Sequence, residues 1–322
     1  MKRIALQVSP EAKAAYFADY QQVAKNEFAW LFAGVDHEYR VTGPFEYIAL
    51  SQDATDLQKL LRLSFAQGVY ALENDLLQPL EDQAQFFLHE DFVFGSKYRG
   101  KTNERLTQML INVGLAAIGK HANGDMKLLD PMCGRGTTLL WAMRYGMQAR
   151  GIEQDPAALD DIHRHLKKWT KLHRQKHRMA DGFVGGKKSK TGGQFLEFDI
   201  GHCAMRVTVG DARDADQLYK HDKFDLLVSD LPYGVQHRTT ERTRNPLAVI
   251  EQCLDAWSRC LKKQGAMVLA FNSNNPKRSC LVDVLEKHGL SVLSFEAAHR
   301  MSESIVRDVI VVKHGETVSE TG

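Results

Sequence analysis

The stretch Leu128-Leu129-Asp130-Pro131-Met132-Cys133-Gly134-Arg135-Gly136-Thr137-Thr138 decides how this chain folds. Its leucines end a short apolar run, two closely spaced glycines follow, and a helical pattern continues to Tyr145. Glycine has no side chain, so the backbone can turn sharply there and approach a ligand closely. The stretch therefore predicts a strand over 126–129 that runs through a glycine-rich turn into a helix over 137–145.

The segments that follow this stretch alternate between strand and helix patterns. Short apolar strands are predicted over 149–153, 206–209, 224–228 and 266–271. Helices intervene, and 290–295 with 305–312 form a closing strand pair. This alternation predicts an α/β fold: a doubly wound, Rossmann-like sheet, mostly parallel with an antiparallel last strand, and helices on both faces.

The first 95 residues form a separate pattern. A strand is predicted over 3–8, a helix start at Ser9-Pro10-Glu11, and a further strand over 45–50. We therefore expect two domains: a smaller N-terminal α/β domain over 1–95, with RNA binding as one role for it, and a larger domain over 96–315. Residues 163–200 form a basic, glycine-rich insertion in the larger domain.

Composition narrows the class of protein. The chain has 322 residues, of which 43% are hydrophobic, and a net charge of +2, so it can build sizeable cores while its total charge identifies no partner. Five cysteines, an odd number without metal-type spacing, predict free thiols and a reducing, cytoplasmic location. No signal peptide or membrane-spanning run is recognised, so no membrane association is expected.

The glycine-rich turn has acidic partners further along the chain. Gly134 and Gly136 lack the third glycine of a dinucleotide fingerprint, since Leu139 occupies that position, and no phosphate-binding P-loop is present. Glu153 ends the next strand, nineteen residues after Gly134, where a carboxylate can accept both ribose hydroxyls of an adenosine-containing cofactor. Asp211-Ala212 follows a third strand and can take the adenine amine. The alternative is a plain turn with solvated strand ends.

A second motif, Asp230-Leu231-Pro232-Tyr233, follows a strand about one hundred residues later. A nucleobase amine is a poor nucleophile because its lone pair is delocalised into the ring. Hydrogen bonds from the amine to Asp230 and a backbone carbonyl favour the pyramidal form, Pro232 fixes the backbone, and Tyr233 offers a stacking face. The motif predicts methylation of an exocyclic amine. A simple turn after a strand is the alternative.

Together the two motifs carry a family resemblance. The chain resembles class I S-adenosylmethionine-dependent methyltransferases, and within them the THUMP-associated tRNA guanosine-N2 methyltransferases. Asp130 to Gly136 is similar to the cofactor loop of that family, and Asp230 to Gly234 is similar to its catalytic loop. Arg99 to Glu104 resembles the segment that closes over the methionine end of the cofactor. A THUMP domain is not recognised in residues 1–95, and residues 170–200 are longer than the usual connection.

The resemblance implies a set of functional residues. S-adenosyl-L-methionine is the expected cofactor, and Asp230, Pro232 and Tyr233 are the expected catalytic residues. The expected cofactor-binding residues are Thr102, Asn103, Asp130, Cys133, Gly134, Gly136, Thr137, Glu153, Asp211, Ala212 and Asp230.

The insertion is rich in lysine and arginine. Such a concentration can supply phosphate contacts, although charge runs also occur on solvated helix faces. The expected RNA-binding residues are Lys167, Lys168, Lys171 and Arg174. Four histidines share this segment, at positions 163, 165, 173 and 177. They lack a nearby thiolate and lie among positive charges, so no metal site is expected.

The leading hypothesis is methyl transfer from S-adenosylmethionine to an exocyclic amine in structured RNA, with guanosine N2 in tRNA as the expected target. A DNA adenine or cytosine amino-methyltransferase is the alternative enzyme. A nucleic-acid-binding protein that has lost its chemistry and a nicotinamide-dependent oxidoreductase are further alternatives. The Asp-Leu-Pro-Tyr loop disfavours both. The sequence names no accessory protein.

Overall fold

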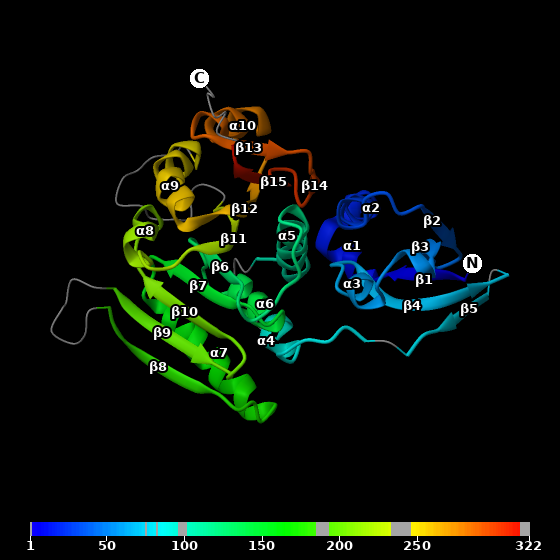
Figure 1. Cartoon of the computed structure of the whole chain (residues 1–322), viewed down its shortest axis with the longest axis horizontal. Coiled ribbons are helices and arrows are strands. Elements are labelled where there is room, and N and C mark those ends of the chain that lie inside the picture. Colours follow the sequence, from blue (N-terminus) through cyan, green and yellow to red (C-terminus); the bar gives the residue numbers. More distant parts are fainter. Residues whose placement is uncertain are drawn as a thin grey trace, which may run out of the picture.

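The computed structural model describes residues 2–74, 76–81, 83–95, 102–184, 193–232 and 246–315. These residues form two sheets, one of five strands and one of ten. The smaller sheet belongs to the N-terminal part and the larger to the rest, with helix α5 (Glu104–Ala117) between them (Figure 1). No described helix has the length and hydropathy needed to cross a lipid bilayer.

The N-terminal sheet is antiparallel and has the order β2-β3-β1-β4-β5. Its strands are β1 (Arg3–Val8), β2 (His37–Thr42), β3 (Phe45–Ser51), β4 (Ala66–Glu73) and β5 (Leu76–Pro79). Its helical elements are α1 (Pro10–Tyr16), η1 (Phe17–Asp19), α2 (Tyr20–Leu31), η2 (Gln52–Ala54) and α3 (Leu57–Leu61). Helix α1 begins as its sequence predicts, because the Ser9 side chain accepts a hydrogen bond from the Glu11 amide and Pro10 occupies the first turn.

The larger sheet has a parallel core. Its order is β13-β15-β12-β11-β6-β7-β10-β9-β8, and β14 pairs with β15. The five strands from β12 to β10 run parallel, and the strands outside them are antiparallel. The core strands are β6 (Lys127–Asp130), β7 (Gln148–Glu153), β10 (Ala204–Val209), β11 (Phe224–Asp230) and β12 (Leu261–Asn272). The flanking strands are β8 (Arg178–Phe183), β9 (Gln194–Asp199), β13 (Leu290–Leu293), β14 (His299–Arg300) and β15 (Val306–His314).

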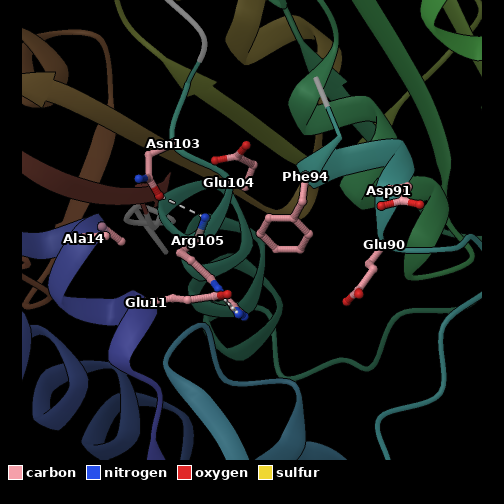
Figure 2. Close-up of a pocket in the computed structure, with 9 residues that line it drawn as sticks. Glu11, Ala14, Glu90, Asp91, Phe94, Asn103, Glu104 and Arg105 are labelled. Carbon is pink, nitrogen blue, oxygen red and sulfur yellow. Dashed lines mark hydrogen bonds and ion pairs between the residues drawn. The ribbon is translucent and has the colours of Figure 1, made fainter. Parts of the chain in front are cut away.

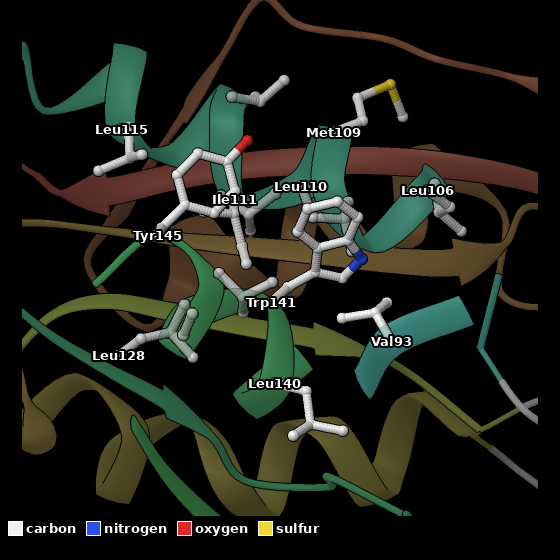
Figure 3. Close-up of a cluster of buried hydrophobic side chains, with 14 of the residues drawn as sticks. Val93, Leu106, Met109, Leu110, Ile111, Leu115, Leu128, Leu140, Trp141 and Tyr145 are labelled. Carbon is white, nitrogen blue, oxygen red and sulfur yellow. The ribbon is translucent and has the colours of Figure 1, made fainter. Parts of the chain in front are cut away.

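Helices cover both faces of this sheet. They are α4 (Asp91–Phe94), α5, α6 (Thr137–Arg144), α7 (Ala157–Leu172), η3 (Ala212–Asp214), α8 (Ala215–Leu218), α9 (Pro246–Cys260) and α10 (Arg278–Lys287). Neighbouring residues of a strand point to opposite faces, so Leu128 joins the core beneath α5, α6 and α7, whereas Leu129 joins the core beneath α8, α9 and α10. Figure 3 shows Trp141 and Tyr145 packed against α5 in the first of these cores.

The first core continues into the N-terminal part, because buried residues of both parts form one cluster. Polar contacts accompany it. The fully buried carboxylate of Glu27 on α2 accepts hydrogen bonds from the Ser64 amide at 3.0 Å and from the Asn112 side chain of α5 at 2.8 Å. Trp30 donates to the Val113 carbonyl oxygen at 3.1 Å. The N-terminal part is therefore fixed to the helix that precedes the glycine-rich turn.

The predicted fold class is confirmed: the larger sheet has a parallel core and helices on both faces, and its last strand is antiparallel. The division at residue 95 stays a prediction. The hairpin of β8 and β9 was not foreseen, because its glycines and basic residues conceal the alternation of exposed and buried positions. It adds two strands to the sheet next to β10, in the segment described from sequence as a basic insertion.

Candidate active site

Four carboxylate side chains lie at the ends of four neighbouring parallel strands. Asp130 ends β6, Glu153 ends β7, Asp230 ends β11, and Asp211 lies two residues after β10. The strand order β11-β6-β7-β10 places them in a row, roughly 14 Å long for a strand spacing of about 4.8 Å. Ligands of open α/β sheets bind at this edge. The row favours a ligand that is cationic or rich in hydrogen-bond donors.

The glycine-rich turn exposes its backbone beside this row. Gly134 and Gly136 have φ angles of 53° and 81°, in the left-handed region that favours glycine. A Cβ atom at Gly134 would meet no described atom within 4 Å, so the backbone there borders open space. The Gly136 amide donates to the Cys133 carbonyl oxygen at 2.8 Å, and the buried Thr137 begins α6. The loop thus presents backbone where the sequence predicts a cofactor.

Cys133 packs inward from this loop. It is 6% exposed, and burial raises the pKa of its thiol well above the usual value. A Cβ atom at Gly151 of β7 would lie 2.7 Å from its sulfur, so Gly151 is needed for this packing. Since the thiol stays protonated and faces the sheet, Cys133 borders the ligand space through its backbone.

Asp130 links the glycine loop to the catalytic strand. Its Oδ1 accepts hydrogen bonds from the Ser229 hydroxyl at 2.8 Å and from the Met132 amide at 3.1 Å. Burial raises the pKa of Asp130 to about 6; the hydrogen bonds from Thr138 and Ser229 oppose this, and the negative charge of Asp230 adds to it. The negative charge of Asp230 thus acts on Asp130 from the neighbouring strand.

Asp230 ends β11 next to β12. The following amide, that of Leu231, donates to the Ala270 carbonyl oxygen at 2.9 Å and holds the start of the loop to β12. The Asp230 carboxylate is 9% exposed and forms an ion pair of 3.0 Å with Arg307 of β15. Pro232 is half-buried. Tyr233, the third expected catalytic residue, and Gly234 after it lie outside the described residues.

The two acids expected to bind adenosine already have local partners. Glu153 is half-buried, and its Oε1 accepts a hydrogen bond from the Asp155 amide at 2.9 Å. Asp211 pairs with Arg213, which holds the pKa of that carboxyl below its usual value, and the Asp211 side chain also caps η3. Ala212 is buried at the start of η3. Both carboxylates lie in the row, each with part of its acceptor capacity in use.

A pocket of about 300 Å³ opens between the N-terminal part and the larger domain (Figure 2). It is lined from α1, from α4 and from the start of α5, where Arg105 pairs with Glu11. Asn103 lies on its wall, and its side chain caps α5 by accepting from the Arg105 amide at 2.9 Å and the Leu106 amide at 3.0 Å. Thr102 is half-buried just before it. Residues 96–101, from which Arg99 to Lys101 were expected to contribute, lie outside the described residues.

Comparison of the sequence with known protein families identifies the family of this chain. The model of the UPF0020 family, described as RMKL-like, methyltransferase domain, matches residues 111–299, which is more than half of the chain and contains the glycine loop, the row of acids and β11. The chain belongs to this family. It is an S-adenosylmethionine-dependent methyltransferase of an RNA methylase family, and S-adenosylmethionine is its cofactor. The resemblance drawn from the two motifs is confirmed.

Solved structures of similar fold include several methyltransferases. TrmN from Thermus thermophilus aligns with 14% identity and a TM-score of 0.46 over 87% of this chain and 60% of its own. The T. thermophilus 16S rRNA N2 G1207 methyltransferase RsmC aligns with 16% identity and a TM-score of 0.39, over 92% of this chain and 62% of its own. A putative RNA methyltransferase of Pyrococcus horikoshii, PH1948, aligns with 16% identity and a TM-score of 0.41, over 71% of this chain and 92% of its own.

This methyltransferase thus spans about 60% of the length of TrmN. The comparison with curated proteins gave no significant match.

The cofactor fits the chemistry of the row. S-adenosylmethionine carries a sulfonium, two ribose hydroxyls and an adenine amine, and the row offers carboxylates next to an exposed backbone turn. The strand order places the acids in the row Asp230, Asp130, Glu153 and Asp211. Their individual contacts with the cofactor stay predictions.

The residues expected to bind RNA lie on the exposed side of α7 and just after it. Lys167, Lys168, Lys171 and Arg174 are all exposed, and none has an acidic partner among the residues that the structure describes. Lys168 lies 4.2 Å from the centre of the Trp169 ring. The structure therefore presents the four charges to solvent together. Lys187, Lys188 and Lys190, further along the insertion, lie outside the described residues.

The histidines of this segment have local partners. His165 is buried and its Nε2 lies 2.7 Å from the Phe92 carbonyl oxygen, and His173 pairs with Asp91 at 2.8 Å. His89, Asp91 and His173 have ligand atoms within 4.8 Å of one another. However, the two imidazoles stack at 3.7 Å with planes 18° apart, so an ion in the plane of one ring lies out of the plane of the other. The three residues form a contact between the start of α4 and the end of α7.

Two residues of the site were missed from sequence. Ser229 precedes Asp230 in an otherwise apolar strand, and that polar position was a usable signal. Arg307 is 77 residues from Asp230 along the chain, and its signal was weaker: Arg307 and Asp308 are two charges inside an apolar strand, and both are at most 5% exposed. Buried charges of this kind are paired, but the sequence does not name the partner.

Proposed function

We propose that this methyltransferase methylates an exocyclic amine of a nucleobase in structured RNA, with guanosine N2 in tRNA as the target. The observation that carries the proposal is the place of Asp230: it ends β11, the strand beside β6 and its glycine loop, and its negative charge acts on Asp130. An acceptor for amine hydrogens therefore lies next to the position expected for the methyl donor.

The chain contributes positioning and electrostatics. When bound, S-adenosylmethionine supplies the methyl group: the amine nitrogen bonds to the methyl carbon while the electrons of the carbon–sulfur bond stay on sulfur. Asp230 accepts a hydrogen bond from the amine, which directs the nitrogen lone pair away from the carboxylate and stabilises the positive charge that develops on nitrogen. Pro232 restricts the backbone after Asp230, and the methylated nitrogen loses one proton to water.

A polymeric nucleic acid is favoured over a free nucleoside as the acceptor by the charges on α7. This helix starts at the active-site edge, so Lys167 lies about 15 Å from that edge at 1.5 Å per residue. Helix α7 packs against β9, four strands from β11, a lateral distance of about 19 Å. A nucleic acid that contacts both Asp230 and Lys167 therefore spans about 25 Å. A folded RNA or a DNA duplex meets this requirement, whereas a free nucleoside does not, and the choice of RNA follows the family of the chain.

The experiment is methyl transfer from labelled S-adenosylmethionine to total tRNA, with total DNA and protein extract in parallel and nucleoside analysis by mass spectrometry. Label in N2-methylguanosine supports the proposal and leaves the position to be mapped. Label in DNA, or in adenine or cytosine amines, replaces the substrate while the role of Asp230 stands. No label in any acceptor, despite measurable cofactor binding, contradicts the proposal.

We also propose a cytoplasmic location. All five cysteines are free thiols, and four of them are buried, which is the usual state in a reducing compartment. The experiment is cell fractionation followed by detection of the protein with an antibody. Recovery of the protein in an oxidising compartment contradicts the cytoplasmic location.

A further inference from the structure

Asp230 has a basic partner that the two sequence motifs do not contain. Arg307, on β15, places its Nη2 3.0 Å from Asp230 Oδ2, and the two side chains are 6% and 9% exposed. Strand β12 separates β15 from β11, so Arg307 reaches across one strand to the catalytic carboxylate. Removing two opposite charges from water costs about as much as their attraction returns, so a buried pair is weak evidence for stability alone.

The position of Arg307 is fixed by its neighbours. His299 of β14 pairs with Arg307 across the β14–β15 ladder and is 1% exposed. The ring of His299 meets Tyr16 of α1 edge-on, with centres 5.3 Å apart. The neighbouring Arg300 amide donates to the Asp19 carboxylate at 2.8 Å. The N-terminal part therefore supports the hairpin that places Arg307 against Asp230.

The groups that face Arg307 keep its charge directed at Asp230. Burial lowers the pKa of His299, and the positive charge of Arg307 lowers it further, so the ring next to Arg307 is neutral. Asp308 points to the other side of β15, where it pairs with Arg278 at 2.6 Å. Asp130 lies beyond Asp230, on β6, and adds negative charge on that side.

We propose that Arg307 is a positioning residue for methyl transfer, which fixes the orientation of the Asp230 carboxylate as the acceptor for the amine of the target base. The inference rests on the proposed function. The guanidinium donates to Asp230 Oδ2 at 3.0 Å, and a charge-assisted hydrogen bond of this kind holds the carboxylate in one orientation. Asp230 therefore acts as a hydrogen-bond acceptor throughout: the nitrogen forms its bond to the methyl carbon, the carbon–sulfur electrons stay on sulfur, and the surplus proton passes to water.

The test compares single-turnover methyl transfer by full-length wild type, Arg307→Ala and Arg307→Lys on the acceptor that the wild type methylates. We expect Arg307→Ala to lower the rate about 100-fold, the cost of one oriented charge at a reacting centre. The dissociation constants for S-adenosylmethionine and RNA stay within about threefold, because Arg307 orients Asp230 and binds neither. Arg307→Lys keeps the charge without the planar fork and recovers part of the rate.

Chemical rescue separates positioning from a structural role. Guanidinium chloride at a concentration far below the unfolding range should raise the rate of Arg307→Ala at least about fivefold, since the ion restores the missing partner of Asp230. The matched control is Arg278→Ala, which removes the pair between Arg278 of α10 and Asp308, the neighbour of Arg307 on β15. It should lower the melting temperature, leave the rate nearly unchanged and show no rescue.

The results distinguish a failure of the positioning role from a failure of the proposed function. An active wild type together with an Arg307→Ala variant of unchanged rate, or of reduced rate that guanidinium does not restore, overturns the positioning role and leaves the proposed function intact. If Arg307→Ala is faster than wild type, the ion pair slows methyl transfer by Asp230. This result also overturns the positioning role. A wild type that methylates no amine removes the proposed function and this inference with it.

Discussion

The hydroxyl of Ser229 donates a 2.8 Å hydrogen bond to the carboxylate of Asp130, and both groups are buried. Ser229 precedes Asp230, the proposed amine acceptor at the end of β11, and Asp130 precedes the glycine loop after β6. The bond therefore joins the two motifs, ninety-nine residues apart, across adjacent strands. It thereby connects the strand that ends in the proposed amine acceptor with the loop that is proposed to bind the cofactor.

Ser229→Ala tests this connection. The substitution leaves the buried Asp130 oxygen with one hydrogen bond fewer, which costs about 1–3 kcal/mol of unfolding free energy. We expect a lower urea midpoint and weaker S-adenosylmethionine binding by calorimetry. Ser258→Ala is the control, since no partner is found for the Ser258 hydroxyl among the described residues. Equal effects of the two substitutions contradict the connection.

Asp130 predicts a pH dependence of stability. Its pKa is raised to about 6 in the folded chain, so between pH 4 and 6 the folded state binds more protons than the unfolded state. The stability contributed by this group is therefore full below pH 4 and falls as the pH rises to 6, by up to about 1.4 kcal/mol for each pH unit in that interval. Relative to Asp130→Asn, the wild type should lose about 1–3 kcal/mol from pH 4 to pH 7 in urea titrations. If the difference in unfolding free energy between wild type and Asp130→Asn is the same at pH 4 and pH 7, Asp130 does not cause this pH dependence.

Asp230→Asn tests the amine acceptor. The amide has the shape of the carboxylate but no charge, so we expect the methyl transfer rate to fall by about 100- to 1000-fold. Cofactor binding should change less than about threefold, because the glycine loop and Glu153 are intact. Asp199→Asn, a half-buried position at the sheet edge opposite the row of acids, should keep full activity. Unchanged turnover of Asp230→Asn removes Asp230 from the mechanism.

Charge reversal on α7 tests the RNA surface. Replacing Lys167, Lys168 and Lys171 by Glu should weaken RNA binding and reduce the slope of log K against log salt by up to about 3, one per lost phosphate contact. The control triple Lys263, Lys277 and Lys287 is also exposed but lies elsewhere on the larger domain. Similar losses in both triples indicate a general charge effect, and an unaltered slope in the α7 variant means that this face is only solvated.

Asn112→Ala tests the contact between the N-terminal part and α5. Asn112 donates to the Glu27 carboxylate and to the Arg62 carbonyl oxygen, both at 2.8 Å, and accepts from the Tyr145 hydroxyl at 2.6 Å. Its loss leaves a buried carboxylate with fewer donors, so we expect a loss of about 2–4 kcal/mol in urea unfolding. Gln22→Ala, on the exposed face of α2, is the control. A loss below about 0.5 kcal/mol for Asn112→Ala contradicts a stabilising network.

Much of the larger domain was predictable because its signals are local. Gly134 and Gly136 mark a turn by their own conformational freedom, and apolar runs such as 224–228 mark buried parallel strands. Proline and the residue before it mark the starts of α7 and α9. The acids Asp130, Glu153, Asp211 and Asp230 each follow such a run, so their place at one edge of the sheet follows from the alternation of strands and helices.

The partners of those acids were not predictable, because they depend on which strands become neighbours. The pairing of Arg307 with Asp230 needs β15 to lie one strand away from β11, and the support of His299 by Tyr16 needs the N-terminal part to pack against β14. The hairpin of β8 and β9 was hidden by its composition.

By itself the sequence determined the strand–turn–helix pattern, the position of each acid after its strand and the family. The tertiary structure alone decided which charges meet in the buried site, because hydrogen bonds and ion pairs between distant segments form only when the hydrophobic cores have fixed the strand order.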